Sequence, residues 1–353
     1  MMKAVRIVAH GGLDVLEYGD HPLPVPRPQE VLVRVLATSV SGWDVKYRRG
    51  EIGTGLPGRK RFPLPMQPGR DAAGVVEAVG ADVHEFQIGD RVVGLVHPAN
   101  PASPMTVRGL SNLSTDIDYP GHTMFGGNAQ FVVRPASYWL PLPEKVTPSN
   151  AAAAMWAYAT ASRILTDRLQ VRPADSVLII GASGGMGTAT VDLAHLAGLR
   201  VVATTRHSTK RDFLLHRGAD RVHVLSSGND ILALRALAPT LGFDGAIDYS
   251  GDERMLRLCV DVLRPGGTLV LTAGEGSPAP VPIKPSDFVR LELNVRGARA
   301  STLNDQRVVL ELLAQERIRP AIHATMPMSQ VSEAHAMLER GDITGRLLLD
   351  PWA

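Results

Sequence analysis

The sequence predicts an α/β protein of two domains, one a doubly wound parallel sheet and the other rich in β-strands. Its 353 residues exceed the usual size of a single hydrophobic core. After Asp175, apolar strand-like runs alternate with amphipathic helical segments, as in a parallel sheet covered by helices. Before that point, short β-type runs separated by Pro and Gly predict a compact β domain.

The expected elements follow this division along the chain. Strands are expected in the first half at 31–35, 74–80 and 91–94, and in the second half at 176–180, 201–205, 222–225, 245–248 and 268–272. Five helices are expected: one that ends at 197, one that ends near 218, one around 256, and two at 308–313 and 331–338. A last strand at 347–349 is placed to rejoin the first domain, which gives domains at 1–157, 158–299 and 300–353, the last completing the first. The stretch 97–127 is polar and without a clear period, so it predicts a loop, either ordered or mobile.

Composition excludes several classes of protein. No apolar run approaches the roughly eighteen residues of a membrane span, and the N-terminus has no secretory leader pattern, so we expect a cytoplasmic protein. A net charge of +2 without a long basic block gives no reason to expect a nucleic-acid partner. The single cysteine, Cys259, shares a predicted helix face with Leu256, Val260 and Leu263, which favours a core position.

A glycine-rich turn follows the strand at 176–180 and precedes a predicted helix. Its residues are Gly181, Ala182, Ser183, Gly184, Gly185, Met186 and Gly187. Glycines permit a tight turn and let the backbone approach a pyrophosphate, whose charge is stabilised by the N–H groups of a helix N-terminus. Strand, turn and helix stand in the order that a dinucleotide site requires.

The same turn also matches the nucleophile elbow of α/β-hydrolases. Gly181, Ser183 and Gly185 fit G-x-S-x-G, and Asp248 and His335 follow in the chain order of that triad. This pattern leaves the third glycine of the turn unexplained. Hydrolysis with Ser183 as nucleophile stays open as an alternative of another class.

The segment after the second strand indicates which nicotinamide cofactor is used. NAD-specific sites carry a carboxylate roughly twenty residues after the glycines, where it binds the ribose hydroxyls. Here Thr204, Thr205 and Arg206 hold that place, and no acidic residue occurs before Asp212. Arg206 and Lys210 supply donors and positive charge suited to a 2′-phosphate, although both could also be ordinary surface charges. The sequence therefore favours NADPH.

Nearly the whole chain resembles the medium-chain dehydrogenase/reductases, in particular the zinc-independent quinone oxidoreductase branch, with some likeness to crotonyl-CoA reductase-type enoyl reductases. The segments that carry the resemblance are 44–50, 68–76, 159–161, the glycine turn 181–187 and 341–346. The resemblance implies a GroES-like catalytic domain, a Rossmann NADP-binding domain and a cofactor bound between them. It also implies a homodimer that forms through an edge strand near 293–298.

The resemblance places the three catalytic-zinc ligands of related alcohol dehydrogenases at Ser41, Arg70 and Trp156. None of these is a suitable zinc ligand. The lobe that binds structural zinc in those relatives corresponds to 97–127, which contains no cysteine. His97 and His122 lie there and could be metal ligands, but we expect both to be solvent-exposed loop residues. No metal is therefore assigned.

Cofactor contacts are also implied by the resemblance. Thr160 is expected near the nicotinamide, with Ser250, Ala273 and Gly274 along the cofactor and Arg346 near its phosphates. Arg346 could instead cap a helix end. The glycine turn, Thr205, Arg206 and Lys210 complete the expected site.

The expected chemistry is hydride transfer from NADPH to an electron-poor carbon of an enone, enoyl thioester or quinone. Arg70 is expected to stabilise charge on the substrate oxygen, with a structural salt bridge to Asp44 or Asp71 as the alternative. Ser41 and Tyr158 are candidate hydrogen-bond or proton donors, and Tyr158 could equally be a core residue.

Trp43 and Trp156 are expected to form apolar walls, unless they simply pack in the core. Zinc-independent relatives commonly carry an Asn-Pro pair where this chain has Ser41-Gly42-Trp43, so a quinone substrate does not transfer directly. A metal-free alcohol or aldehyde dehydrogenase, or an NADPH-binding protein with little turnover, are the other readings. In each case the partner is a small molecule.

Overall fold

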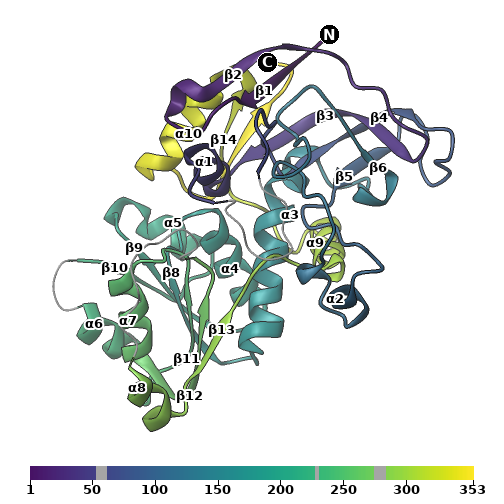
Figure 1. The fold of residues 1–353 in the computed structure, drawn as a ribbon. Coiled ribbons are helices and arrows are strands. Elements are labelled where there is room, and N and C mark those ends of the chain that lie inside the picture. Colours follow the sequence, from purple (N-terminus) through teal and green to yellow (C-terminus); the bar gives the residue numbers. More distant parts are fainter. Residues whose placement is uncertain (53–61, 227–229, 274–283) are drawn as a thin grey trace. The chain divides into compact units, whose positions relative to one another are not determined.

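The computed structural model describes residues 1–52, 62–226, 230–273 and 284–353 (Figure 1). The chain forms two compact units. Unit 1 comprises Met1–Ala159 together with Ala300–Ala353, and unit 2 comprises Thr160–Arg299. Each unit has buried apolar clusters of its own. No helix within the described ranges is long and apolar enough to cross a membrane.

Unit 2 is built on a six-stranded sheet in which every strand pair is parallel. The strands are β8 (Ser176–Ile180), β9 (Arg200–Thr205), β10 (Arg221–Val224), β11 (Phe243–Asp248), β12 (Leu263–Leu271) and β13 (Asn294–Gly297). Their spatial order is β10-β9-β8-β11-β12-β13, so the order reverses between β8 and β11. Ligands of doubly wound sheets bind at the carboxyl ends of the strands at such a reversal.

Helices of unit 2 follow its strands in the chain (Figure 1). They are α4 (Gly185–Leu196), α5 (Arg211–His216), α6 (Asp230–Leu237), α7 (Glu253–Val262) and α8 (Pro285–Leu291), with the 3₁₀ turn η5 (Ser208–Lys210). Helix α7 begins where the Asp252 carboxylate accepts from the N–H groups of Arg254 and Met255. Its inner face buries Leu256 and Cys259, which confirms the core position predicted for the cysteine.

Unit 1 contains a seven-stranded sheet and a two-stranded sheet. The larger sheet follows the order β14 (Ile322–Pro327), β15 (Arg346–Asp350), β3 (Glu30–Val40), β4 (Ala72–Val79), β5 (Arg91–Gly94) and β7 (Trp139–Pro141), with β6 (Phe131–Pro135) also paired to β3. The smaller sheet pairs β1 (Met2–Ile7) with β2 (Leu16–His21). Strand β15 lies antiparallel to β3, so the last strand of the chain pairs with a strand from its first half.

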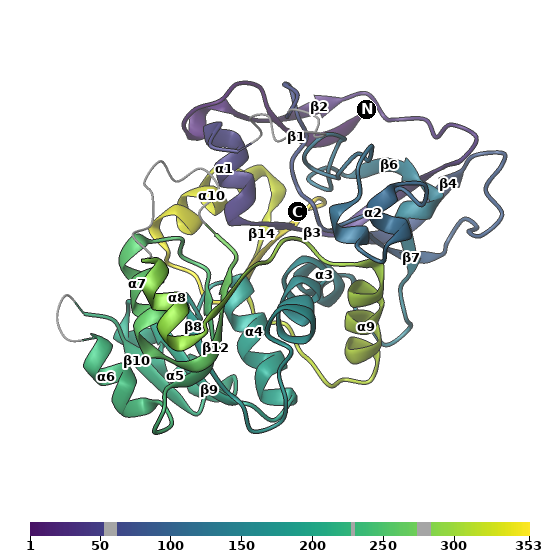
Figure 2. The same cartoon turned by 60° about the horizontal axis from the view of Figure 1, so that its bottom comes forward.

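Helices α1 (Gly42–Arg49), α2 (Pro104–Val107), α9 (Leu303–Ala314) and α10 (Val331–Arg340) belong to unit 1 (Figure 2). Short turns η1 (Leu13–Val15), η2 (Ser111–Leu113), η3 (Ala136–Tyr138) and η6 (Met328–Gln330) complete it. Helix α3 (Pro148–Arg163) begins in unit 1, ends in unit 2 and continues into the π-helical segment η4 (Ile164–Leu169). The stretch 97–127, expected as a loop, contains α2 and η2.

Candidate functional site

The glycine turn of unit 2 connects β8 directly to α4. Gly181 takes a left-handed φ of 76°, and Gly184 is the N-cap of α4. A Cβ at Gly187 would lie 2.2 Å from the Gly181 carbonyl oxygen, so only glycine lets the helix approach the turn this closely. The first N–H groups of a helix have no intrahelical partner, and here they lie at the carboxyl end of β8. This geometry suits a pyrophosphate.

The neighbouring strand β11 ends beside the same turn. Asp248 pairs with Ile180 of β8, and its carboxylate accepts hydrogen bonds from the Ser250 hydroxyl at 2.6 Å and from the Gly251 N–H at 2.9 Å. Ser250 therefore lies at the strand reversal, tied to Asp248. Ala273 follows β12, whereas Gly274 lies outside the described residues.

The end of β9 carries the residues expected to select the cofactor. Thr205 is buried at the strand end, Arg206 is exposed, and Lys210 closes the turn η5. Asp212 lies one turn further on, in α5. Positive charge without a carboxylate is therefore placed directly after the strand.

Two of the nucleophile-elbow residues have other partners within their own units. Ser183 is partly exposed in the turn, and the Asp248 carboxylate is taken by Ser250 and Gly251. His335 is buried in unit 1, where its Nδ1 lies 3.5 Å from Nη1 of Arg48. Thr160 and Met186, the remaining expected cofactor contacts of unit 2, lie at the C-terminal part of α3 and in the first turn of α4.

Arg70 lies in unit 1 as a buried cation among aromatic rings. Its side chain is 7% exposed, and its guanidinium carbon lies 4.6 Å from the centre of the Trp156 ring and 5.6 Å from that of Tyr119. Nη2 donates to the Tyr47 hydroxyl at 3.1 Å. Nε is buried and has no partner among the described residues. The site therefore holds a positive charge, and the Nε–H of Arg70 can still donate a hydrogen bond.

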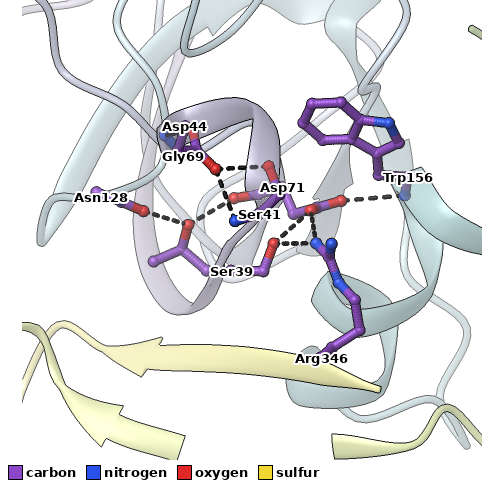
Figure 3. A network of polar contacts seen from close by, with 9 residues as sticks. Ser39, Ser41, Asp44, Gly69, Asp71, Asn128, Trp156 and Arg346 are labelled. Atoms are coloured by element: carbon purple, nitrogen blue, oxygen red, sulfur yellow. Dashed lines mark hydrogen bonds and ion pairs between the residues drawn. The ribbon is translucent and has the colours of Figure 1, made fainter. Parts of the chain in front are cut away.

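The expected alternative, a salt bridge from Arg70 to Asp44 or Asp71, is wrong. Arg70 forms no ion pair with either carboxylate within the described part of the chain. Asp71 instead pairs with Arg346, whose Nη2 lies 2.6 Å from Oδ2 (Figure 3). Arg346 is the first residue of β15 and caps no helix. Its proposed contact with cofactor phosphates stays a prediction.

Asp71 connects three elements of unit 1 (Figure 3). Oδ2 accepts the Ser39 hydroxyl at 2.5 Å as well as Arg346, and Oδ1 accepts the backbone N–H of Trp156 at 3.1 Å. Burial raises the pKa of Asp71, and the Arg346 charge and these donors oppose that shift. Asp71, the neighbour of Arg70 in sequence, thus binds the backbone of α3 at Trp156, and the Trp156 ring contacts the Arg70 guanidinium.

Ser41 is engaged locally. Its N–H and its hydroxyl donate to Oδ2 of Asp44 at 2.8 and 2.7 Å, and the Gly69 N–H donates to Oδ1 at 3.3 Å (Figure 3). This capping box begins α1 and ties it to the segment before Arg70. Burial raises the pKa of Asp44 against these bonds. Tyr158, the other expected donor, is 2% exposed in α3.

The two histidines expected on the surface of the 97–127 stretch are buried, so that prediction is wrong. His97 is 5% and His122 is 7% exposed. His97 packs edge to face against Trp156, with ring centres 6.1 Å apart, and His122 stacks on Tyr47 at 4.7 Å. Polar composition misled the prediction, because imidazoles pack as aromatic rings in this unit. The described residues contain no group of three or more His, Cys, Asp and Glu side chains arranged to hold a metal ion.

Sequence reasoning missed the aromatic enclosure and the buried polar contacts around Arg70. Trp43 does contact Trp156, at 6.3 Å between ring centres, as the expected wall requires. Tyr47 and Tyr119 were not expected there. Tyr47 lies on α1, within the segment 44–50 that carries the resemblance. Its position in that segment was the one sequence feature that could have indicated a place near Arg70.

Two family models match the chain. "Alcohol dehydrogenase GroES-like domain" matches residues 27–144, and "Zinc-binding dehydrogenase" matches residues 185–315. The first range falls within unit 1. The second covers most of unit 2 and reaches into the C-terminal segment of unit 1.

Relatives match over almost the whole chain. Quinone oxidoreductase of Homo sapiens is 29% identical, over 99% of this chain and 98% of the relative. The crystal structure of AibC is 31% identical with a TM-score of 0.88, covering 99% of this chain and 95% of that one. The crystal structure of an NAD-dependent alcohol dehydrogenase is 28% identical with a TM-score of 0.90, covering 99% of both chains.

A parallel sheet with this strand order and glycine turn, joined to a GroES-like unit, defines a nucleotide-dependent oxidoreductase. The chain belongs to the medium-chain dehydrogenase/reductase superfamily, in its quinone oxidoreductase-like branch.

Proposed function

We propose that this oxidoreductase uses NADPH to reduce an activated carbon–carbon double bond, in an enone, an enoyl thioester or a quinone. The observation that carries the proposal is Arg70, a buried cation on the Trp156 ring whose Nε has no partner among the described residues. The resemblance to alcohol dehydrogenases implies that Arg70 stands at the position of a zinc ligand. A fixed positive charge in a site of low polarity stabilises an oxygen on which negative charge develops.

The residues at the three zinc positions do not fit a zinc ion. The Ser41 hydroxyl is bonded to Asp44, Arg70 is a cation, and Trp156 offers only an indole N–H donor. No step of the proposed reaction passes through a metal. Proposed turnover therefore depends on charge stabilisation by side chains.

A bound NADPH would supply a hydride to the electron-poor carbon of the substrate and leave as NADP⁺. The electron pair of the substrate double bond moves toward the carbonyl oxygen to give a delocalised enolate, and one proton taken up from solvent at the α-carbon completes the reduction. Arg70 stabilises that oxygen through charge and directed N–H groups. An isolated ketone would instead give a localised alkoxide, which demands stronger stabilisation. Conjugate reduction is the reaction that this site supports best.

The preference for NADPH rests on the residues after β9. The solved NAD-dependent relative shows that the same fold also uses NAD. In this chain Arg206 is exposed directly after the buried Thr205, and the adjacent positions carry no carboxylate. A 2′-phosphate bound there gains charge-assisted hydrogen bonds of about 1.5–3 kcal/mol each.

The cofactor assignment is tested by binding. NADPH is expected to bind at least about tenfold more tightly than NADH, measured by titration of nicotinamide fluorescence. Arg206→Glu should weaken NADPH far more than NADH, because a carboxylate repels the phosphate yet accepts from a ribose hydroxyl. Arg200→Glu, at the opposite end of β9, is the matched control. Equal affinity of the native protein for both cofactors would refute the assignment.

The reaction class is tested by turnover. We expect NADPH oxidation with 2-cyclohexen-1-one, crotonyl thioesters or 1,4-benzoquinone, and little NADP⁺ reduction with simple alcohols. Arg70→Ala should lower kcat by about tenfold or more, the value of one lost charged hydrogen bond. Arg34→Ala removes a partly exposed arginine of the same unit, which pairs with Glu77, and should leave the rate unchanged. A native enzyme that prefers primary alcohols would overturn the proposal.

We further propose a homodimer formed through β13, the edge strand of the unit 2 sheet. Its Val295 is 36% exposed, and Val289 of the preceding α8 is 78% exposed. An unpaired strand edge with apolar neighbours favours association with a second copy. Light scattering should give twice the chain mass, and Val295→Pro should give monomers. A monomeric native protein would disprove this.

A further inference from the structure

Two separate elements of the C-terminal segment hold His97 in place. The Gln306 side chain on α9 accepts from the Val96 N–H at 2.8 Å and donates to the His97 carbonyl at 3.1 Å. Ser301, just before α9, contacts the imidazole: its hydroxyl lies 2.8 Å and its backbone nitrogen 3.2 Å from Nδ1. Ser301 and Gln306 are fully buried. Main chain and ring of His97 are therefore fixed independently.

The Ser301 contact determines which ring nitrogen carries the proton. A backbone N–H can only donate, so Nδ1 of His97 must be the acceptor. In a neutral imidazole the proton then sits on Nε2. Burial, with the nearby charge of Arg70, holds the pKa of His97 well below its usual range, so the ring is neutral at physiological pH.

The protonated nitrogen is left without a partner. Nε2 makes no hydrogen bond within the described ranges, and it is not among the side-chain atoms that are both buried and unpartnered. Although His97 as a whole is 5% exposed, this atom therefore keeps a small accessible surface. The ring also packs edge to face on Trp156, the indole that carries the Arg70 guanidinium. A fixed N–H donor and a fixed cation thus share one aromatic ring.

We propose that His97 is a second substrate-binding donor, whose Nε2–H bonds the same carbonyl oxygen that Arg70 stabilises. The inference rests on the proposed function and deepens it, because it selects substrates whose double bond is conjugated to a carbonyl. The imidazole stays neutral and gives up no proton. It polarises the carbonyl and binds the enolate oxygen as charge accumulates there. Ser301 is a positioning residue that keeps the donor tautomer in place.

The tautomer is tested without any substrate. Protein labelled with ¹⁵N-histidine is studied by long-range ¹H–¹⁵N correlation, and the His97 signals are assigned by their loss in His97→Gln. We expect the Nε2–H tautomer, unchanged between about pH 6 and 8. An Nδ1–H tautomer, or protonation of His97 within that range, would overturn the inference whatever the activity.

The donor role is tested by two substitutions with opposite expectations. His97→Phe keeps a ring against Trp156 but has no donor, and we expect kcat/KM for enone reduction to fall roughly tenfold to a hundredfold. His97→Gln offers an amide donor and should retain most of the rate. The same change at an exposed site, His84→Phe, is the matched control. Thermal unfolding confirms that each variant is folded.

The outcomes separate the two proposals. If the native protein reduces enones and His97→Phe does so equally well, the donor role is wrong and the proposed function stands. If Phe and Gln at position 97 lose activity equally while folded, the residue acts through packing, and the donor role is again wrong. If the native protein reduces no conjugated carbonyl, the proposed function itself fails, and the role of His97 fails with it.

Discussion

Replacing Asp71 by Asn should destabilise unit 1 strongly without changing the size of the side chain. The Asp71 carboxylate is 1% exposed and receives the Arg346 guanidinium at 2.6 Å, the Ser39 hydroxyl and the Trp156 N–H. An Asn oxygen can still accept from Trp156. Its NH₂ group would then face two other donors, and Arg346 would keep its charge without a counter-ion.

The expected loss follows from these contacts. Removing one partner of a buried ion pair costs about 3–5 kcal/mol, because the remaining charge is left uncompensated. Arg346→Met should cost a similar amount, since it leaves the Asp71 carboxylate buried without its cation. The double variant removes both charges, so its loss should be smaller than the sum of the single losses by roughly 0.5–3 kcal/mol.

Tryptophan fluorescence provides an assay specific to unit 1. All four tryptophans, at positions 43, 139, 156 and 352, lie in that unit. Urea unfolding followed by this signal gives the free energy of unfolding of unit 1 for the native protein and the three variants. A loss under about 1 kcal/mol for Asp71→Asn, or strictly additive losses, would show that Asp71 is not the buried counter-ion of Arg346.

Three further predictions concern other positions. Gly187→Ala should destabilise unit 2 by about 1–3 kcal/mol and weaken NADPH binding, because its Cβ would lie 2.2 Å from the Gly181 carbonyl oxygen. Calorimetric titration measures the binding. A variant that binds NADPH as tightly as the native protein would contradict the packing argument. Burial and the charge of Arg48 lower the pKa of His335 to about 3, below its unfolded value. The contribution of His335 to stability is therefore present above about pH 6.5 and is lost as the pH falls toward 3. His335→Gln should flatten that part of the plot of unfolding free energy against pH, and an unchanged slope would refute this. Burial also raises the pKa of the Cys259 thiol, so a disulfide reagent should label it only after urea unfolds unit 2, whereas rapid labelling of the native protein would contradict its burial.

The order of elements in unit 2 could be predicted because its signals are local. The strand 176–180, the glycine turn and the helix after it are adjacent in sequence, and their apolar periods are distinct. The surroundings of Arg70 could not be predicted in the same way. Arg346 pairs with Asp71 across 275 positions, and no periodicity links two residues so far apart. A polar, proline-rich composition likewise does not reveal that His97 is buried.

The contacts around Asp71 and His97 join the N-terminal part of unit 1 to its C-terminal segment. His97 and Ser301 are separated by 204 positions, and Ser39 and Arg346 by 307, with all of unit 2 encoded between them. Loop-closure entropy for such contacts must be overcome before they contribute any stability, so we expect them to form late. The sheet of unit 2 comes from one continuous segment and needs no residue beyond 299 to pair its strands. We therefore expect the glycine turn to form without the C-terminal segment. Asp71 and His97, in contrast, gain their contacts to Arg346, Ser301 and Gln306 only once that segment has folded onto the rest of unit 1.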